Sequence, residues 1–156
     1  VAIGATNLIF TAIAMCIIDK VGRKKLLIVG SVGTFLCLAV ISVLFLTGKH
    51  QNLLLWPLGG FVAFFAVSQG SVIWVYISEI FPNSVRAKGQ SLGSCTHWLT
   101  CAALSTFFPV VAVHTAAAPF IFFSSMMVLQ LIWGKTMVPE TKVVPLEQMQ
   151  KRLGIE

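Results

Sequence analysis

The most regular feature of the sequence is a series of long apolar segments separated by short polar connectors. Five of these segments approach or exceed the roughly 18–20 residues that an α-helix needs to cross a bilayer. They are uniformly apolar and lack the alternation of period two that marks a barrel strand, which leaves helices to satisfy the backbone in hydrocarbon. The pattern predicts an all-α, polytopic membrane helical bundle. The predicted spans are Val1–Ile18, Leu26–Thr47, Leu53–Ile80, Ser91–Val113 and Pro119–Met137.

Composition favours a membrane protein over a soluble domain. Hydrophobic residues make up 57% of the 156 residues and charged residues only 10%, whereas a soluble domain carries about 25% charged residues. The net charge of +6 comes from basic residues in short segments between apolar runs, which argues for a lipid bilayer and against nucleic acid as the partner. We expect buried free thiols at the cysteines, which lie inside apolar runs without metal-ligand spacing. They are Cys16, Cys37, Cys95 and Cys101.

The connectors differ strongly in their basic residues. Those at 19–25 and 81–90 and the tail at 138–156 share one side if all five segments cross. Ten Lys and Arg residues lie on that side, including Lys135 just inside the last span, and Lys49 alone lies on the other. Because cytoplasmic loops carry the excess of basic residues, this bias predicts a multi-pass protein of the cell's inner (plasma) membrane with these connectors and the tail in the cytoplasm.

The two ends of the chain carry separate expectations. Val1 begins within an apolar run, without an initiator Met or a basic leader, so we expect a piece of a longer protein. In the tail, Leu146, Met149 and Leu153 fall on one helical face, opposite polar and charged residues. This spacing predicts a short amphipathic helix under the cytoplasmic face, and a frayed terminus is the alternative.

Acidic residues lie at the C-terminal ends of two predicted spans. Asp19 follows the first span and Glu79 nearly ends the third, where the helix dipole disfavours negative charge by roughly 0.3–1 kcal/mol. Such carboxylates need a basic partner or access to water, and Arg23 and Arg86 are close in sequence. We therefore predict a conformational charge network of Asp19, Arg23, Glu79 and Arg86. Separate solvation of each charge is the alternative.

Three motifs of the sequence resemble those of a known family of membrane proteins. The segment DKVGRK at 19–24 looks like a loop that is repeated in both halves of such proteins. Residues 70–74 and 78–82 with Arg86 resemble the signature of their tenth helix, and VPETK at 138–142 is similar to the element after their twelfth helix. Their order and spacing agree over nearly the whole chain, which therefore resembles the sugar porter family of the major facilitator superfamily. The resemblance places the chain at helices eight to twelve of a twelve-helix fold.

The resemblance implies a substrate path between two six-helix bundles, so the N-terminal half of the same transporter becomes a partner of this chain. The substrate contacts that it implies by position are Asn7, Trp74, His97 and Trp98. The sequence departs from the family at His97, where Gln or Asn is usual. It also has Ser71 and Ile73 where proline is frequent, which predicts a less kinked or differently hinged helix.

The depth of these residues can be estimated without the family. At a rise of 1.5 Å per residue, Trp74 lies about 12 Å, His97 about 10–11 Å and Asn7 about 18 Å from the cytoplasmic end of its span, against a half-thickness of roughly 15 Å. Polar groups at that depth are costly unless they face a cavity or a partner. Amide, imidazole and indole groups suit the hydroxyls and the apolar face of a sugar. Helix–helix hydrogen bonding by Asn7 and packing by the three rings are the alternatives.

These observations predict transmembrane transport of a monosaccharide by alternating access, with or without coupling to protons. The alternative within the same superfamily is a carrier of another small solute, such as an organic acid or a cation, which His97 motivates. The spans carry no convergent acid, base, nucleophile or metal cluster in the sequence, so we expect neither an enzyme nor a cofactor. A scaffold fragment without transport of its own is a further alternative.

Overall fold

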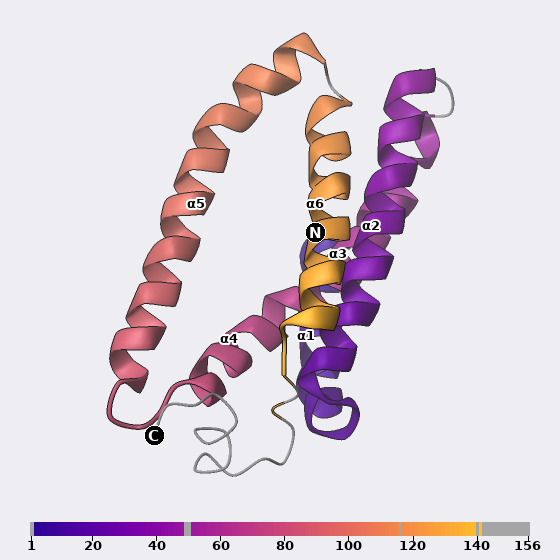
Figure 1. Ribbon diagram of the computed structural model, residues 1–156. Coiled ribbons are helices and arrows are strands. Elements are labelled where there is room, and N and C mark those ends of the chain that lie inside the picture. The colour runs from indigo at the N-terminus through magenta and orange to yellow at the C-terminus, as the bar shows by residue number, and fades with distance from the viewer. Residues whose placement is uncertain (1, 49–50, 116, 140, 142–156) are drawn as a thin grey trace.

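The computed structural model describes residues 2–48, 51–115, 117–139 and 141, and this part of the chain is a bundle of helices joined by short turns (Figure 1). The predicted all-α class agrees with this architecture. The helices are α1 (Ala2–Val21), α2 (Arg23–Thr47), the 3-10 turn η1 (Gln51–Leu53), α3 (Leu55–Val67), α4 (Gln69–Ile80), α5 (Arg86–His114) and α6 (Ala118–Thr136). The predicted tail helix lies outside the described residues.

Four stretches of the described residues are long and apolar enough to cross a membrane. They are Ile3–Val21, Arg23–Thr47, Leu55–Ile80 and Ala118–Thr136. The remaining predicted span, Ser91–Val113, is helical throughout within α5, whose 29 residues extend about 43 Å. It is more polar than the others, and an intramembrane helix with polar side chains usually faces a cavity or a partner helix.

The predicted span Leu53–Ile80 is two helices rather than one. The backbone leaves helical geometry at Ser68, with φ −113° and ψ −89°, and α4 begins at the next residue. The Ser68 hydroxyl donates to the Phe64 carbonyl at 2.7 Å, and the Ser71 hydroxyl donates to the Ala66 carbonyl at 2.8 Å. Serine side chains that hydrogen-bond the preceding turn bend helices and satisfy freed carbonyls. The helix is thus broken without proline.

Helix α2 lies at the centre of the packing, with α6 and α3 against it, whereas α5 stands further out and contacts α4 and α6 (Figure 1). Small residues on α2 allow the close approach. A Cβ at Gly30 would lie 1.7 Å from the Ser68 hydroxyl, and one at Gly33 would lie 2.3 Å from the Phe64 ring. Membrane helices commonly pack through such small residues. Gly30 therefore places α2 directly against the break between α3 and α4.

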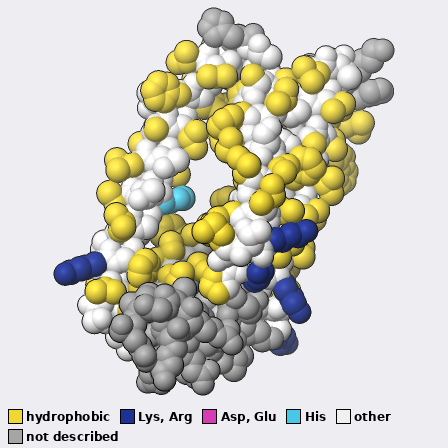
Figure 2. Space-filling model, viewed as in Figure 1, with side chains coloured by type: hydrophobic (Ala, Val, Ile, Leu, Met, Phe, Trp, Pro, Cys, Tyr) yellow, Lys and Arg dark blue, Asp and Glu magenta, His cyan; other side chains and the backbone are white. Residues whose placement is uncertain are grey.

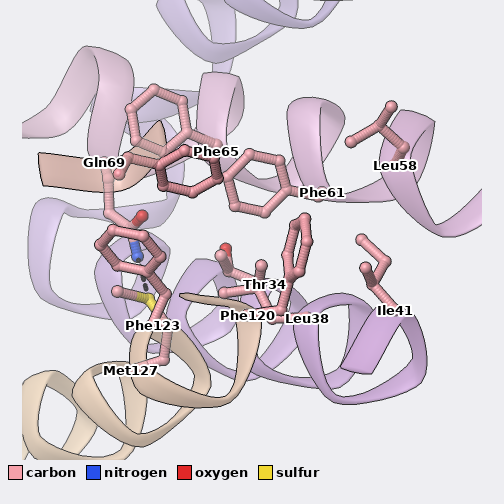
Figure 3. A pocket seen from close by; sticks show the side chains of 11 residues that line it. Thr34, Leu38, Ile41, Leu58, Phe61, Phe65, Gln69, Phe120, Phe123 and Met127 are labelled. Atoms are coloured by element: carbon pink, nitrogen blue, oxygen red, sulfur yellow. Dashed lines mark hydrogen bonds between the residues drawn. The ribbon is translucent and has the colours of Figure 1, made fainter. Parts of the chain in front are cut away.

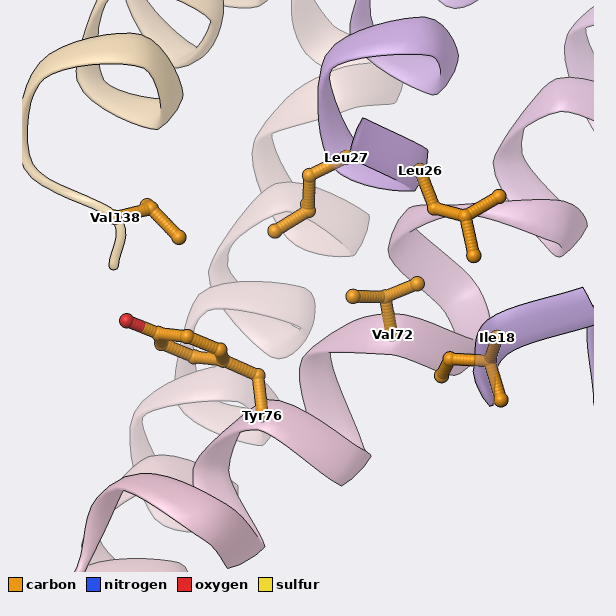
Figure 4. Close-up of a cluster of buried hydrophobic side chains, with 6 residues drawn as sticks. All are labelled: Ile18, Leu26, Leu27, Val72, Tyr76 and Val138. Atoms are coloured by element: carbon orange, nitrogen blue, oxygen red, sulfur yellow. The ribbon is translucent and has the colours of Figure 1, made fainter. Parts of the chain in front are cut away.

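A tight turn at Gly22 joins α1 to α2 and brings a hydrophobic cluster together beneath it. Gly22 has a φ of 97°, which favours glycine because it lacks a Cβ. The buried cluster draws side chains from α1, α2, α4 and the segment after α6 (Figure 4). Its members are Ile18, Leu26, Leu27, Val72, Tyr76 and Val138. This end of the bundle carries the connectors that we predict to be cytoplasmic.

Candidate functional site

Three predicted site residues form a group of aromatic rings between α4 and α5. The rings of Trp74 and His97 meet edge to face, with centroids 5.2 Å apart and planes at 79°. His97 and Trp98 are similarly arranged, with centroids 5.5 Å apart and planes at 74°. Trp74 lies six residues after the break at Ser68, so the second half of a discontinuous helix positions it. Binding sites of membrane carriers typically lie beside such discontinuous helices.

The ring group is accessible from one side of the described residues. Trp74 is 43% exposed and Trp98 is 68% exposed, and the molecular surface is hollowed between α5 and the other helices (Figure 2). His97 Nε2 lies 3.7 Å from the Cys101 thiol, one helical turn along α5. The group therefore offers an imidazole, two indole N–H groups and two apolar ring faces to a bound molecule.

Asn7 lies apart from this group. It belongs to α1, its side chain is exposed, and no hydrogen bond among the described residues joins it to Trp74, His97 or Trp98. Its neighbours Thr6 and Phe10 line a groove between α1 and α3. The role of Asn7 as a substrate contact stays a prediction.

The structure brings three of the four predicted network charges into contact. Arg23 Nη2 lies 2.7 Å from Glu79 Oε1 and 2.9 Å from Asp19 Oδ1, and Arg23 Nε donates to Glu79 Oε2 at 3.1 Å. Arg23 is only 8% exposed. Arg86 instead donates from Nε to the Phe81 carbonyl at 3.4 Å, and no ion pair joins it to Asp19 or Glu79 within the described part of the chain.

Sequence reasoning missed one member of this charge cluster, which in the structure comprises Asp19, Arg23, Glu79 and Thr141. The Thr141 hydroxyl donates to Glu79 Oε2 at 2.5 Å, and Thr141 is 4% exposed. In the sequence, the motif at 138–142 indicates a resemblance only, and the Thr141 hydroxyl is the one local sign of a polar contact. A second contact supports the return of this segment, since Lys24 Nζ donates to the Lys135 carbonyl at the end of α6, at 2.9 Å.

A separate cavity of about 330 Å³ lies among α2, α3 and α6 (Figure 3). Phenylalanine rings dominate its wall, including Phe61, Phe65, Phe120 and Phe123. The Gln69 amide points to Met127 Sδ, at 3.6 Å, and is 7% exposed. With so few polar groups the cavity does not match a polyhydroxylated solute. The ring group between α4 and α5 is the better candidate site.

Apolar helices and a broken helix beside indole and imidazole groups are features that membrane carriers typically share. The family described as "Sugar (and other) transporter" matches residues 1–153 of the chain. The chain therefore belongs to this family of transporters, as the three motifs predicted.

Two curated relatives and one solved structure illustrate the similarity. The chain is 35% identical over 162 residues to "Probable polyol transporter 3" of Arabidopsis thaliana, covering 99% of this chain and 32% of the relative. It is 36% identical over 151 residues to "Arabinose-proton symporter" of Bacillus subtilis, covering 96% and 32%.

The solved structure is the major facilitator superfamily proton:xylose symporter XylE bound to 6-bromo-6-deoxy-D-glucose. It superposes with a TM-score of 0.85 at 32% identity, over 96% of this chain and 33% of that chain. The predicted sugar porter resemblance and the helical major facilitator fold are confirmed. The chain spans about a third of the length of these relatives.

Proposed function

We propose that the chain forms part of a carrier that moves a monosaccharide across the cell's inner (plasma) membrane by alternating access. The observation that carries the proposal is the group of Trp74, His97 and Trp98 between the second half of a broken helix and the most polar helix. A pyranose presents C–H groups to an indole face and hydroxyls to N–H and imidazole groups. Asn7 is proposed as a fourth contact, made across the path from α1.

The charge cluster of Asp19, Arg23, Glu79 and Thr141 supports the proposal of alternating access. Arg23 ties Glu79, near the end of α4, to the turn between α1 and α2. Because α4 is separated from α3 at Ser68, this end of α4 can move as a unit when the cluster opens. We propose that Arg86 joins the network in the full-length protein, and that the basic connectors and the tail lie in the cytoplasm.

Proton coupling is part of the proposal. The names of the arabinose and xylose relatives describe proton symporters, and both substrates are monosaccharides. A polyol transporter also lies among the relatives, and a polyol offers the same vicinal hydroxyls without the ring. We therefore propose a polyhydroxylated solute, with a monosaccharide as the preferred one.

A second candidate within the superfamily is a carrier of an organic acid or a cation. The observation that favours it is His97, an ionisable group where the family usually has an amide. In the described structure the imidazole contacts two indole rings and the Cys101 thiol. None of these three contacts is a carboxylate or a basic group, so they leave the imidazole available to a charged solute.

A solute panel on the purified full-length protein separates the two candidates. We expect monosaccharides, and polyols more weakly, to raise the midpoint of thermal unfolding, because a ligand that binds only the folded state stabilises it. Organic acids and cations should leave the midpoint unchanged at matched ionic strength and pH. A shift with acids or cations and none with any sugar or polyol would contradict the proposed function.

A further inference from the structure

The segment after α6 returns to the bundle and becomes part of its cytoplasmic end. Val138 is 1% exposed and packs against the cluster that contains Leu27 and Tyr76 (Figure 4). Three residues further on, Thr141 is 4% exposed although it is polar. A buried hydroxyl needs a hydrogen-bond partner, and Thr141 finds it in Glu79 of α4.

Glu79 receives three hydrogen bonds from two different parts of the chain. Arg23 donates to Oε1 from Nη2 at 2.7 Å and to Oε2 from Nε at 3.1 Å, a bidentate arrangement that requires the two planar groups to face each other. Thr141 donates to Oε2 at 2.5 Å. Because a glutamate side chain turns about three bonds, the third donor restricts the carboxylate to the orientation that Arg23 binds.

We propose that Thr141 is a positioning residue for the cytoplasmic charge cluster. Its hydroxyl holds the Glu79 carboxylate in the plane of the Arg23 guanidinium and so fastens the end of α4 to the segment that follows α6. A role of Thr141 in transport rests on the proposed function. The position of the Glu79 carboxylate between Arg23 and Thr141 follows from the described hydrogen bonds alone.

Because Glu79 lies in the last turn of α4, its contacts with Arg23 and Thr141 hold that end of the helix. Helix α4 starts after the break at Ser68 and ends at Ile80, so Glu79 is its penultimate residue. The hydrophobic contacts of Val72 and Tyr76 hold the middle of the helix, whereas Glu79 holds its last turn through polar contacts. Loss of one donor should therefore loosen that last turn first.

Two substitutions separate the hydroxyl from the packing of the side chain. Thr141→Val removes the donor and preserves shape and volume, whereas Thr141→Ser preserves the donor and removes a methyl group. A residue that acts only by filling space would tolerate valine at least as well as serine. A residue that acts through its hydroxyl would tolerate serine better.

Hydrogen exchange measured by mass spectrometry on the full-length protein reads the last turn of α4 directly. We expect Thr141→Val to speed exchange there by roughly tenfold, since a hydrogen bond to a charged group is lost, and Thr141→Ser to leave it near the parent rate. Equal exchange in the two variants would overturn the proposal. Thr141→Ala replaces the valine variant in the same comparison if the latter does not fold.

A double-mutant cycle tests whether Thr141 acts through Glu79. In a Glu79→Leu background, which has no acceptor, Thr141→Val should cause no further change in exchange. Additive effects of the two substitutions would contradict a positioning role. Hydrogen exchange needs no substrate, so failure of the proposed sugar transport would appear in uptake assays and leave this result intact.

Discussion

At the scale of single residues, Arg23 has the most completely defined surroundings in the structure. Its guanidinium contacts two carboxylates and also donates from Nη1 to the Ile18 carbonyl at 3.3 Å, while the residue is almost fully buried. A charge removed from water in this way needs all of these partners, because breaking a buried pair leaves an uncompensated charge behind. The ion pair with Glu79 is therefore a sensitive point of the bundle.

The first prediction concerns the geometry of this pair. Arg23→Gln should lower the free energy of unfolding of the full-length protein by about 1–3 kcal/mol, a range reduced from that of fully buried pairs because Glu79 is partly exposed. Arg23→Lys should recover only part of the loss, since an ammonium group cannot bind both oxygens in one plane. Thermal unfolding in detergent measures both changes.

The matched control is Lys25→Gln, which removes an exposed positive charge from the start of the same helix. It should shift the unfolding midpoint little. Equal midpoints for Arg23→Lys and the parent would show that net charge, and not the bidentate geometry, is what the site requires.

Residue types and positions predicted the cluster of Asp19, Arg23 and Glu79, because acids at helix C-termini call for nearby bases. They did not predict Thr141. Its sequence separation from Glu79 is 62 residues, and nothing local indicates that the segment after α6 folds back beneath α4. Asn7 illustrates a different limit of the sequence. Its depth in the membrane can be counted along the helix, whereas the direction of its side chain depends on how the helices pack.

At the scale of helices, apolar run lengths predicted where α1, α2, α5 and α6 lie, but not the division of the third span. The run from Leu53 to Ile80 lacks an internal proline after Pro57, and the four polar or small residues at 68–71 are too few to end a predicted span. The break comes from Ser68, whose side chain competes for the carbonyl of the preceding turn, and from the close approach of α2 at Gly30. That the missing prolines make this helix less kinked or differently hinged than in the family stays a prediction.

The second prediction tests that close approach. In Gly30→Ala the added Cβ would overlap the Ser68 hydroxyl, so α2 must shift away from the break, at a cost of about 1–3 kcal/mol in the free energy of unfolding. Gly59→Ala on α3 is the control, since a Cβ there meets nothing within 4 Å. Thermal unfolding of the two variants in the full-length protein measures the difference. Equal stability would show that the break tolerates separation from α2.

At the scale of the whole molecule, the described surface exposes more large apolar side chains than the surface of a water-soluble protein does. Leu8 is 72% exposed, Trp56 is 79% exposed and Val113 is 84% exposed, and hydrophobic side chains are spread along the helices of the visible face (Figure 2). Lys and Arg side chains gather toward the end of the bundle that holds the turn between α1 and α2 (Figure 2). This division suits lipid around the helices.

The third prediction concerns orientation. Fusions of green fluorescent protein after Thr47 and after Ile80 should fluoresce only in the second case, because this reporter folds in the cytoplasm and the connector at 81–90 carries Arg86 and Lys88. Alkaline phosphatase fused at the same two positions serves as the reciprocal control, active outside the cytoplasm. The reverse pattern would contradict the assigned orientation.

Uptake of radiolabelled monosaccharide by proteoliposomes that contain the full-length protein tests the central claim, that the ring group on α4 and α5 binds the transported solute. Trp74→Ala should reduce uptake at least a hundredfold, because it removes the indole that joins His97 to α4, while insertion into the membrane stays unchanged. Trp56→Ala, which removes an exposed indole on α3, is the control and should retain uptake. Undiminished uptake by the Trp74→Ala protein would contradict the account.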